Sequence, residues 1–113
     1  MDCLFCKIIK GEIPAKLIYQ DDKVVAIDDI NPQAPHHKLI MPKKHIATLN
    51  DLATADNELI GHMVQVAKKL AKDFNIAEEG YRVVMNCNAG AGQSVFHIHM
   101  HFLGGRPMMW PPG

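Results

Sequence analysis

The sequence lacks long apolar runs, an excess of charge of either sign, and a paired set of cysteines. None of its hydrophobic stretches approaches the roughly 20 residues that a membrane-spanning helix needs, and the N-terminus has no signal-peptide pattern. Lys plus Arg and Asp plus Glu number 12 each, whereas a general nucleic-acid binder carries a basic surface. We therefore expect neither a membrane nor a nucleic-acid partner.

Cysteine content and composition bear on location and on domain number. Three cysteines, an odd number, do not form a disulfide framework, which favours a reducing, cytoplasmic location. Hydrophobic residues make up 48% of the 113 residues and charged residues 21%, a globular balance. There is no internal repeat, low-complexity tract or linker-like shift in composition. We predict a single domain over residues 1–113.

The spacing of the apolar residues predicts an α+β fold. Residues 3–10 suit a short N-terminal helix that ends at Gly11. Residues 56–74 have apolar groups at steps of three and four, which predicts one long amphipathic helix with Asp56 as a candidate cap. The remaining pattern predicts an antiparallel sheet of about five strands. The expected strands cover residues 17–20, 23–29, 38–42, 81–86 and 95–103.

His97, His99 and His101 alternate with apolar residues in "VFHIHMHFL", which predicts one strand face with three imidazoles about 6.5 Å apart. One use of such a row is zinc binding, although the segment contains no carboxylate to orient the ligands. The other use is nucleophilic catalysis at phosphorus, because imidazole is partly unprotonated near neutral pH.

A glycine-rich loop, "NAGAGQS" at residues 88–94, directly precedes this segment. Gly90 and Gly92 would let backbone N–H groups approach an anion, and Asn86 and Ser94 would add side-chain hydrogen bonds. The loop lacks the lysine of a Walker A motif, so it is weak evidence by itself. Beside a histidine row it suits the oxyanion-stabilising half of a phosphoryl-transfer site.

"HIHMHFL" fits the His-φ-His-φ-His-φ-φ motif, and the chain resembles the histidine triad (HIT) family, in particular its nucleoside phosphoramidate hydrolases (the Hint-like branch). The matching stretches are "FCKIIKGEIPAKLIYQDD", "DINPQAPHHKLIMPKKHI" and "GQSVFHIHMHFLGGRPMMWPPG". The chain keeps the third histidine, which the transferase branch of the superfamily replaces. The resemblance implies a HIT-like fold, a two-fold dimer, and hydrolysis of P–N bonds through a covalent nucleotidyl-histidine to give a nucleoside monophosphate.

The resemblance also implies the role of each site residue. His99 would be the nucleophile, His101 would hydrogen-bond the phosphate or leaving group, and His97 and His37 would support them. The implied phosphate and leaving-group contacts are Asn86, Gly92, Ser94 and Val95. The implied nucleoside contacts are Asp29 for the ribose and, for the base, Leu4, Phe5, Ile8, Ile27 and Ile30. The substrates would be purine nucleotides such as AMP or GMP phosphoramidates and aminoacyl adenylates.

Two pairs of adjacent residues and the C-terminal tail complete the implied site. Of His36 and His37, and of Asp28 and Asp29, only one member of each pair can face the site, and the residues alone leave the choice even. The family pattern selects the second member in both pairs. The tail over residues 104–113 is expected to pack at the dimer interface, where Trp110 would contact the leaving group in the partner subunit.

The pair of cysteines in "CLFC" is a weak zinc signal by itself, because zinc needs two further ligands. Some bacterial relatives hold a structural zinc at positions that correspond to Cys3, Cys6, His45 and His97. Many members of the family lack these cysteines, so the resemblance implies that catalysis requires no cofactor.

Three other functions are compatible with the sequence. One is a dinucleoside polyphosphate hydrolase, which the same triad would support. The second is a nucleotide-binding regulatory module with incidental hydrolysis. The third is a zinc protein in which all the histidines of the row are ligands.

Overall fold

A computed structural model describes residues 3–113, so residues 1 and 2 of the predicted domain lie outside the described part. Three short 3-10 turns lie in the connections: η1 (Leu49–Asp51), η2 (Thr54–Asp56) and η3 (Ala89–Ala91). The helices and strands are α1 (Leu4–Ile9), β1 (Leu17–Gln20), β2 (Val24–Asp28), β3 (His36–Pro42), α2 (Asn57–Asp73), β4 (Tyr81–Val84) and β5 (Met100–Gly104). This α+β arrangement confirms the predicted fold class.

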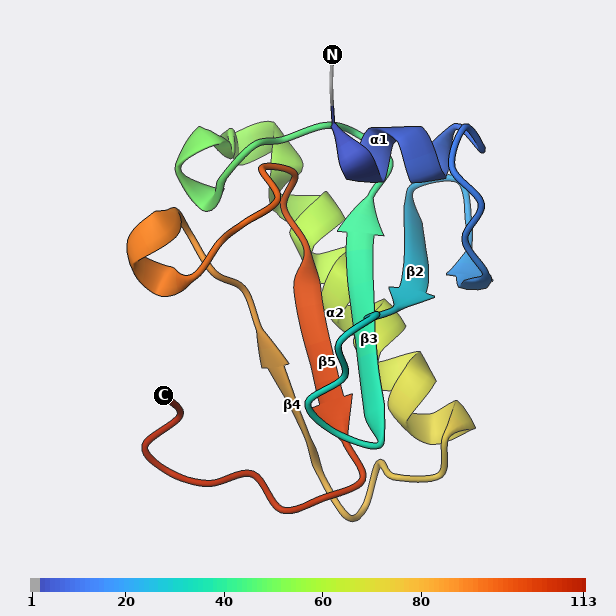
Figure 1. Ribbon diagram of the computed structural model, residues 1–113, viewed down its shortest axis with the longest axis vertical. Coiled ribbons are helices and arrows are strands. Elements are labelled where there is room, and N and C mark those ends of the chain that lie inside the picture. Colours follow the sequence, from blue (N-terminus) through green and yellow to red (C-terminus); the bar gives the residue numbers. More distant parts are fainter. Residues whose placement is uncertain (1–2) are drawn as a thin grey trace.

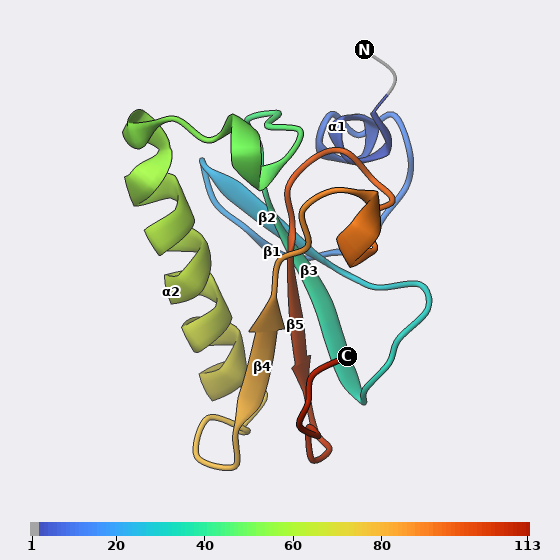
Figure 2. The same cartoon turned by 90° about the vertical axis from the view of Figure 1, so that its left-hand side faces the viewer.

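The five strands form one antiparallel sheet in the order β1-β2-β3-β5-β4. The long helix α2 lies along one face of the sheet, while α1 and the loop that contains η3 lie on the other side (Figures 1 and 2). No helix within residues 3–113 combines the length and the apolar character that crossing a bilayer requires. In the centre of the sheet, β3 pairs with β5 in a register that places Leu39 opposite His101.

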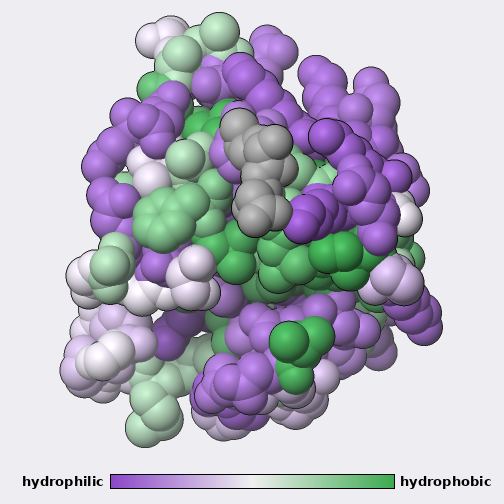
Figure 3. All heavy atoms as spheres, turned by 45° about the horizontal axis from the view of Figure 1, so that its top comes forward, coloured by the Kyte–Doolittle hydropathy of each residue, from purple (hydrophilic) through white to green (hydrophobic). Residues whose placement is uncertain are grey.

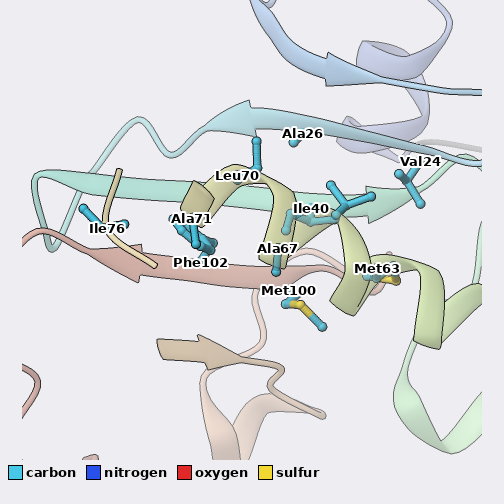
Figure 4. Packing of buried hydrophobic residues seen from close by; sticks show 11 residues of the cluster. Val24, Ala26, Ile40, Met63, Ala67, Leu70, Ala71, Ile76, Met100 and Phe102 are labelled. Carbon is cyan, nitrogen blue, oxygen red and sulfur yellow. The ribbon is translucent and has the colours of Figure 1, made fainter. Parts of the chain in front are cut away.

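The main core lies between α2 and the sheet, where apolar side chains of β2, β3 and β5 meet the apolar stripe of the helix (Figure 4). Phe102, Ile40 and Met63 are fully buried there, and burial of each such side chain contributes about 1.5–3 kcal/mol. The alternate residues of β2 and β3 point to the other face and pack against α1 through Phe5 and Cys3. This second cluster fixes α1 over the site described below.

The last strand begins later than predicted. A strand was expected over residues 95–103, but β5 begins at Met100, so His97 and His99 precede it. The β3–β5 register would place Ile98 opposite Pro42, which has no N–H to donate. The N–H of Ile98 instead donates to the carbonyl of Ile46 at 2.7 Å. The prediction of three histidines on one strand face is therefore wrong.

Other boundaries shift by a few residues. β3 begins at His36 rather than residue 38, and β4 ends at Val84 rather than residue 86. Asp56 stands at the N-cap of α2 but makes no side-chain cap hydrogen bond to that helix. Its carboxylate accepts from the N–H of Ala53 and from Lys44, both within 2.9 Å, so it caps the preceding η2 turn. The predicted capping role of Asp56 is corrected accordingly.

Candidate active site

A cavity of about 350 Å³ opens between α1, the end of β2, the loop after β4, and β5. The surface at the α1 end of the molecule exposes apolar side chains among hydrophilic ones (Figure 3). All ten residues predicted to contact the nucleotide line the cavity, together with His99 and His101, and with Leu39 and Asp28, which were not predicted. The predicted lining residues are Leu4, Phe5, Ile8, Ile27, Asp29, Ile30, Asn86, Gly92, Ser94 and Val95.

In its neutral form, the ring of His99 presents an unprotonated nitrogen to this cavity. Its Nδ1 lies 2.8 Å from the backbone carbonyl of His97, and since a carbonyl can only accept, Nδ1 carries the proton. Nε2 therefore holds a lone pair, and it has no hydrogen-bond partner within residues 3–113 and is not buried. Phe5 contacts the ring edge-on at 5.0 Å and restricts its orientation. This is the arrangement that a nucleophilic imidazole needs.

His37 and His101 form a directional chain of hydrogen bonds. The backbone N–H of Gln33 donates to Nδ1 of His37 at 3.0 Å, so the proton of this ring must lie on Nε2. Nε2 of His37 in turn lies 2.9 Å from Nδ1 of His101, to which it donates. The proton of a neutral His101 is therefore on Nε2, in the ring that lines the cavity. His101 can thus donate to a bound group.

Burial keeps this chain neutral. Burial, together with the neighbouring His99 and His37 rings, lowers the pKa of His101 to about 4, against the opposing effect of Asp29. Burial likewise lowers the pKa of His37. The carboxylate of Asp29 lies 3.4 Å from Nε2 of His37 and 3.9 Å from Nδ1 of His101. Because both rings are neutral near pH 7, each carries one proton.

The structure separates His36 from His37, whereas Asp28 and Asp29 both line the cavity and differ in their partners. His37 is buried beside His101, whereas His36 points to the α2 side and stacks on Phe74 with ring centroids 4.6 Å apart. Asp29 faces His37, whereas Asp28 pairs with Lys38. The second member of each pair lies next to the histidine chain.

The glycine-rich loop offers different donors from those expected. The N–H of Gly92 donates to the carbonyl of Ala89 at 3.0 Å, so it is not available to an anion. Gly92 instead adopts a φ of +93°, which glycine tolerates best, and closes the η3 turn. Within residues 3–113 the N–H groups of Ser94 and Val95 donate to no acceptor, so they and the Ser94 hydroxyl are the available donors.

Gln93 holds this loop in place, a role that the sequence did not reveal. Its side chain is buried, accepts from the N–H of Asn88 at 2.7 Å, and donates to the carbonyls of Ala47 and Val95 at 2.8 and 3.1 Å. In the sequence, the only indication of this role is the polar residue between glycine and serine in "GQS".

Cys3, Cys6, His45 and His97 converge in a separate cluster, with their ligand atoms within 4.8 Å of one another. Nδ1 of His45 and Nδ1 of His97 are 3.2 Å apart, and the measured sulfur-to-nitrogen distances are 3.4 to 3.6 Å. A tetrahedral zinc ion requires an N–N separation of about 3.3 Å and an S–N separation of about 3.6 Å. The four residues therefore fit a zinc ion.

His97 belongs to this cluster rather than to the cavity. It is fully buried, and its Nε2 lies 2.7 Å from the carbonyl of Pro42, so Nε2 carries the proton and Nδ1 faces the cysteines. An N–H donated to a carbonyl is the usual outer-shell support of a metal-bound histidine. Burial and the adjacent Cys3 thiol raise the pKa of Cys6.

After Gly104, the end of β5, the described chain forms no further helix or strand. Arg82 donates to the carbonyl of Met109 at 3.0 Å and ties the tail to β4. Trp110 is 81% exposed and does not line the cavity of its own chain.

Comparison with known proteins shows one family throughout. A HIT domain profile matches residues 10–108. A purine nucleoside phosphoramidase of Escherichia coli K12 is 51% identical over 107 residues, which cover 95% of this chain and 90% of that protein. A 14 kDa zinc-binding protein of Zea mays is 52% identical, covering 97% and 87%. The crystal structure of a HIT family hydrolase from Legionella pneumophila superposes with a TM-score of 0.97, at 56% identity, and covers 99% of this chain and 100% of that one.

Proposed function

This chain belongs to the HIT domain family, and we propose that it hydrolyses purine nucleoside phosphoramidates to a nucleoside monophosphate and an amine. The observation that carries the proposal is the pair of nitrogens in one cavity, an unprotonated Nε2 on His99 and a protonated Nε2 on His101. A nucleophile and an acid side by side suit displacement at phosphorus. The similarity to a protein named as a purine nucleoside phosphoramidase supports the same reaction.

In the first step, Nε2 of His99 attacks the phosphorus atom and the P–N bond breaks. The amine leaves with the proton from Nε2 of His101, a proton from water replaces it on the same nitrogen, and the hydrogen bond from Nε2 of His37 to Nδ1 of His101 stays in place. The His99 ring then carries phosphorus on Nε2 and a proton on Nδ1, and its positive charge is stabilised by the carbonyl of His97. Water next attacks phosphorus, its proton returns to the solvent, and the N–P bond to His99 breaks, which releases the nucleoside monophosphate and restores His99.

The remaining cavity groups have chemistry that suits the rest of the nucleotide. The N–H groups of Ser94 and Val95 and the Ser94 hydroxyl would bind the phosphate oxygens. Asp29 would accept hydrogen bonds from the ribose hydroxyls, because a carboxylate suits a diol. Apolar side chains of α1 and β2 would contact the base.

Cys3, Cys6, His45 and His97 would hold a structural zinc, since four protein ligands leave no open position for a substrate. The name of the maize relative, a zinc-binding protein, supports this assignment. Bound zinc would supply folding energy and hold α1 against the loop before β5.

We also propose that two copies form a two-fold dimer in which the tail reaches the site of the partner subunit. Met109 and Trp110 are exposed apolar groups that an interface would bury. A mass measurement in solution tests the dimer.

The test of the function is steady-state turnover of an adenosine phosphoramidate, compared with aminoacyl adenylates and dinucleoside polyphosphates. We expect the phosphoramidate to have the highest kcat/KM, with formation of AMP. Rapid acid quench should trap the nucleotide on His99. Preferred turnover of a dinucleoside polyphosphate would contradict the proposed substrate class, and absence of turnover of all three would contradict the function.

A further inference from the structure

The protonation pattern of the His37–His101 chain depends on one backbone group, the N–H of Gln33. If this N–H turned away, Nδ1 of His37 could carry the proton and Nε2 could accept from His101. The proton of His101 would then lie on Nδ1, and its Nε2 would have nothing to donate to a leaving amine. The backbone of residue 33 must therefore be held in place.

Arg106 holds it from the C-terminal tail. Nε of Arg106 donates to the carbonyl of Gln33 at 2.8 Å, and Nη1 donates to the carbonyl of Pro107 at 2.9 Å. The guanidinium group thus has partners on both sides. The carbonyl of Gln33 belongs to the peptide that follows the Cα of residue 33, whereas the N–H that binds His37 belongs to the peptide that precedes it, so Arg106 restrains the backbone of residue 33 from its other side. Gln33 itself is exposed and lies in the connection between β2 and β3, where its side chain donates to the carbonyl of Asn31 at 3.1 Å. No packing of this side chain in the core fixes the backbone of residue 33.

The start of the tail is well placed for this role. Gly104 pairs with His36 at the end of the β3–β5 ladder, where the tail leaves the sheet (Figure 1). Gly105 has a φ of +90°, and a Cβ there would lie 3.0 Å from Cβ of Pro35. The backbone of residue 105 therefore lies directly against the connection that contains Gln33, and Arg106 follows it.

We propose that Arg106 is a positioning residue: by holding the carbonyl of Gln33, and with it the backbone of residue 33, it keeps the N–H of Gln33 on His37 and the proton of His101 on the nitrogen that faces the leaving group. This inference rests on the proposed function for its kinetic consequence, whereas the position of the proton can be measured without any substrate.

The kinetic experiment compares two leaving groups on Arg106→Ala. An alkylamine must be protonated to leave, so kcat on an adenosine alkylphosphoramidate should fall about tenfold, a part of the 10²–10⁴-fold that general acid catalysis contributes. The p-nitrophenyl ester of AMP releases a stable anion, so its kcat should stay within about twofold. Arg106→Lys keeps the charge without the planar fork and should behave like Arg106→Ala.

The matched control is Arg82→Ala, which also removes an arginine that binds a tail carbonyl but does not touch residue 33. It should leave both substrates unchanged when the amine is small. Equal losses on both substrates with Arg106→Ala, or the same selective loss with Arg82→Ala, would overturn the proposal.

A second measurement separates this inference from the proposed function. In ¹⁵N-histidine-labelled protein without substrate, Arg106→Ala should move part of the proton population of His101 from Nε2 to Nδ1. An ester in place of the peptide N–H at residue 33 should do the same, and this variant covers a failure of Arg106→Ala to fold. An unchanged His101 tautomer in both variants would refute the inference even if the hydrolysis occurs, whereas a shift without hydrolysis would refute the function alone.

Discussion

His97 and His99 stand two residues apart in the chain, yet they serve two different centres. His97 donates its Nε2 proton to the carbonyl of Pro42 and turns Nδ1 toward two cysteines and His45. His99 donates its Nδ1 proton to the carbonyl of His97 and presents Nε2 to the cavity. The residue type is the same, and a different nitrogen of each ring is bound to a carbonyl.

The carbonyl that accepts from each ring determines which nitrogen keeps a lone pair, and therefore whether the imidazole can bind a metal or attack a substrate. In the Cys/His cluster the nitrogen lone pair points to a site closed by four protein groups. In the cavity the corresponding lone pair points to open space beside a second ring that donates. Substitutions at either centre therefore have different consequences for activity and for stability.

Removing the cavity nucleophile should have the largest effect. His99→Ala should lower kcat on an adenosine phosphoramidate by about 10⁴-fold or more, because no other group in the cavity replaces the attacking nitrogen. AMP binding, measured by calorimetry, should persist, since the apolar wall and Asp29 remain. His36→Gln, which changes a histidine on the opposite face of the sheet, is the control and should keep its activity. A His99→Ala variant with more than about a tenth of the wild-type rate would exclude this nucleophile.

Breaking the Cys/His cluster should affect stability more than chemistry. Cys3→Ser with Cys6→Ser should abolish tight zinc binding and lower the free energy of unfolding by several kcal/mol, since metal binding is coupled to folding. Cys87→Ser, at a cysteine outside the cluster, should change neither. Metal analysis and denaturant unfolding check both quantities. A double variant with unchanged stability and zinc content would show that these residues hold no metal.

Acidification should destabilise the protein through its buried imidazoles. The pKa of His101 falls from 6.5 to about 4 on folding, so below pH 6.5 the unfolded chain binds a proton that the folded chain does not. The contribution of His101 is therefore complete above about pH 6.5 and is lost as the pH falls toward 4, a cost of a few kcal/mol. His101→Gln should reduce the proton uptake on unfolding in this window by about one. An equal uptake in both proteins would contradict the lowered pKa.

Asp29→Asn should have the smallest effect. The substitution keeps the shape of the side chain but weakens charge-assisted hydrogen bonds to the ribose, each worth about 1.5–3 kcal/mol. The ratio of kcat/KM between ribose and 2′-deoxyribose substrates should therefore fall by about tenfold or more. Asp28→Asn, which alters the neighbour paired with Lys38, is the matched control. An unchanged ratio in Asp29→Asn would remove the ribose contact from the account.

Much of the molecule could be predicted from local pattern and family resemblance. Residue spacing located all five strands and both helices to within a few residues, because alternation and the three-to-four period follow from backbone geometry. All ten residues that the resemblance assigned to the nucleotide line the cavity, whereas Leu39 and Asp28 line it without having been predicted.

The features that the sequence did not predict are contacts between residues far apart in the chain. The placement of His97 depends on the carbonyl of Pro42, 55 residues away, and the late start of β5 depends on the missing N–H of the same residue. Gln33, whose N–H donates to His37, and Arg106, which binds the carbonyl of Gln33, are 73 residues apart. No periodicity signals such contacts, because they involve backbone groups that every residue has.

The ¹⁵N spectrum of histidine side chains in the wild-type protein near pH 7 shows directly which nitrogen of His97, His99 and His101 carries the proton. We expect His97 and His101 to carry their protons on Nε2 and His99 to carry its proton on Nδ1. A proton on Nε2 of His99, or the same tautomer on His97 and His99, would contradict the claim that backbone carbonyls divide the two histidines between the two centres.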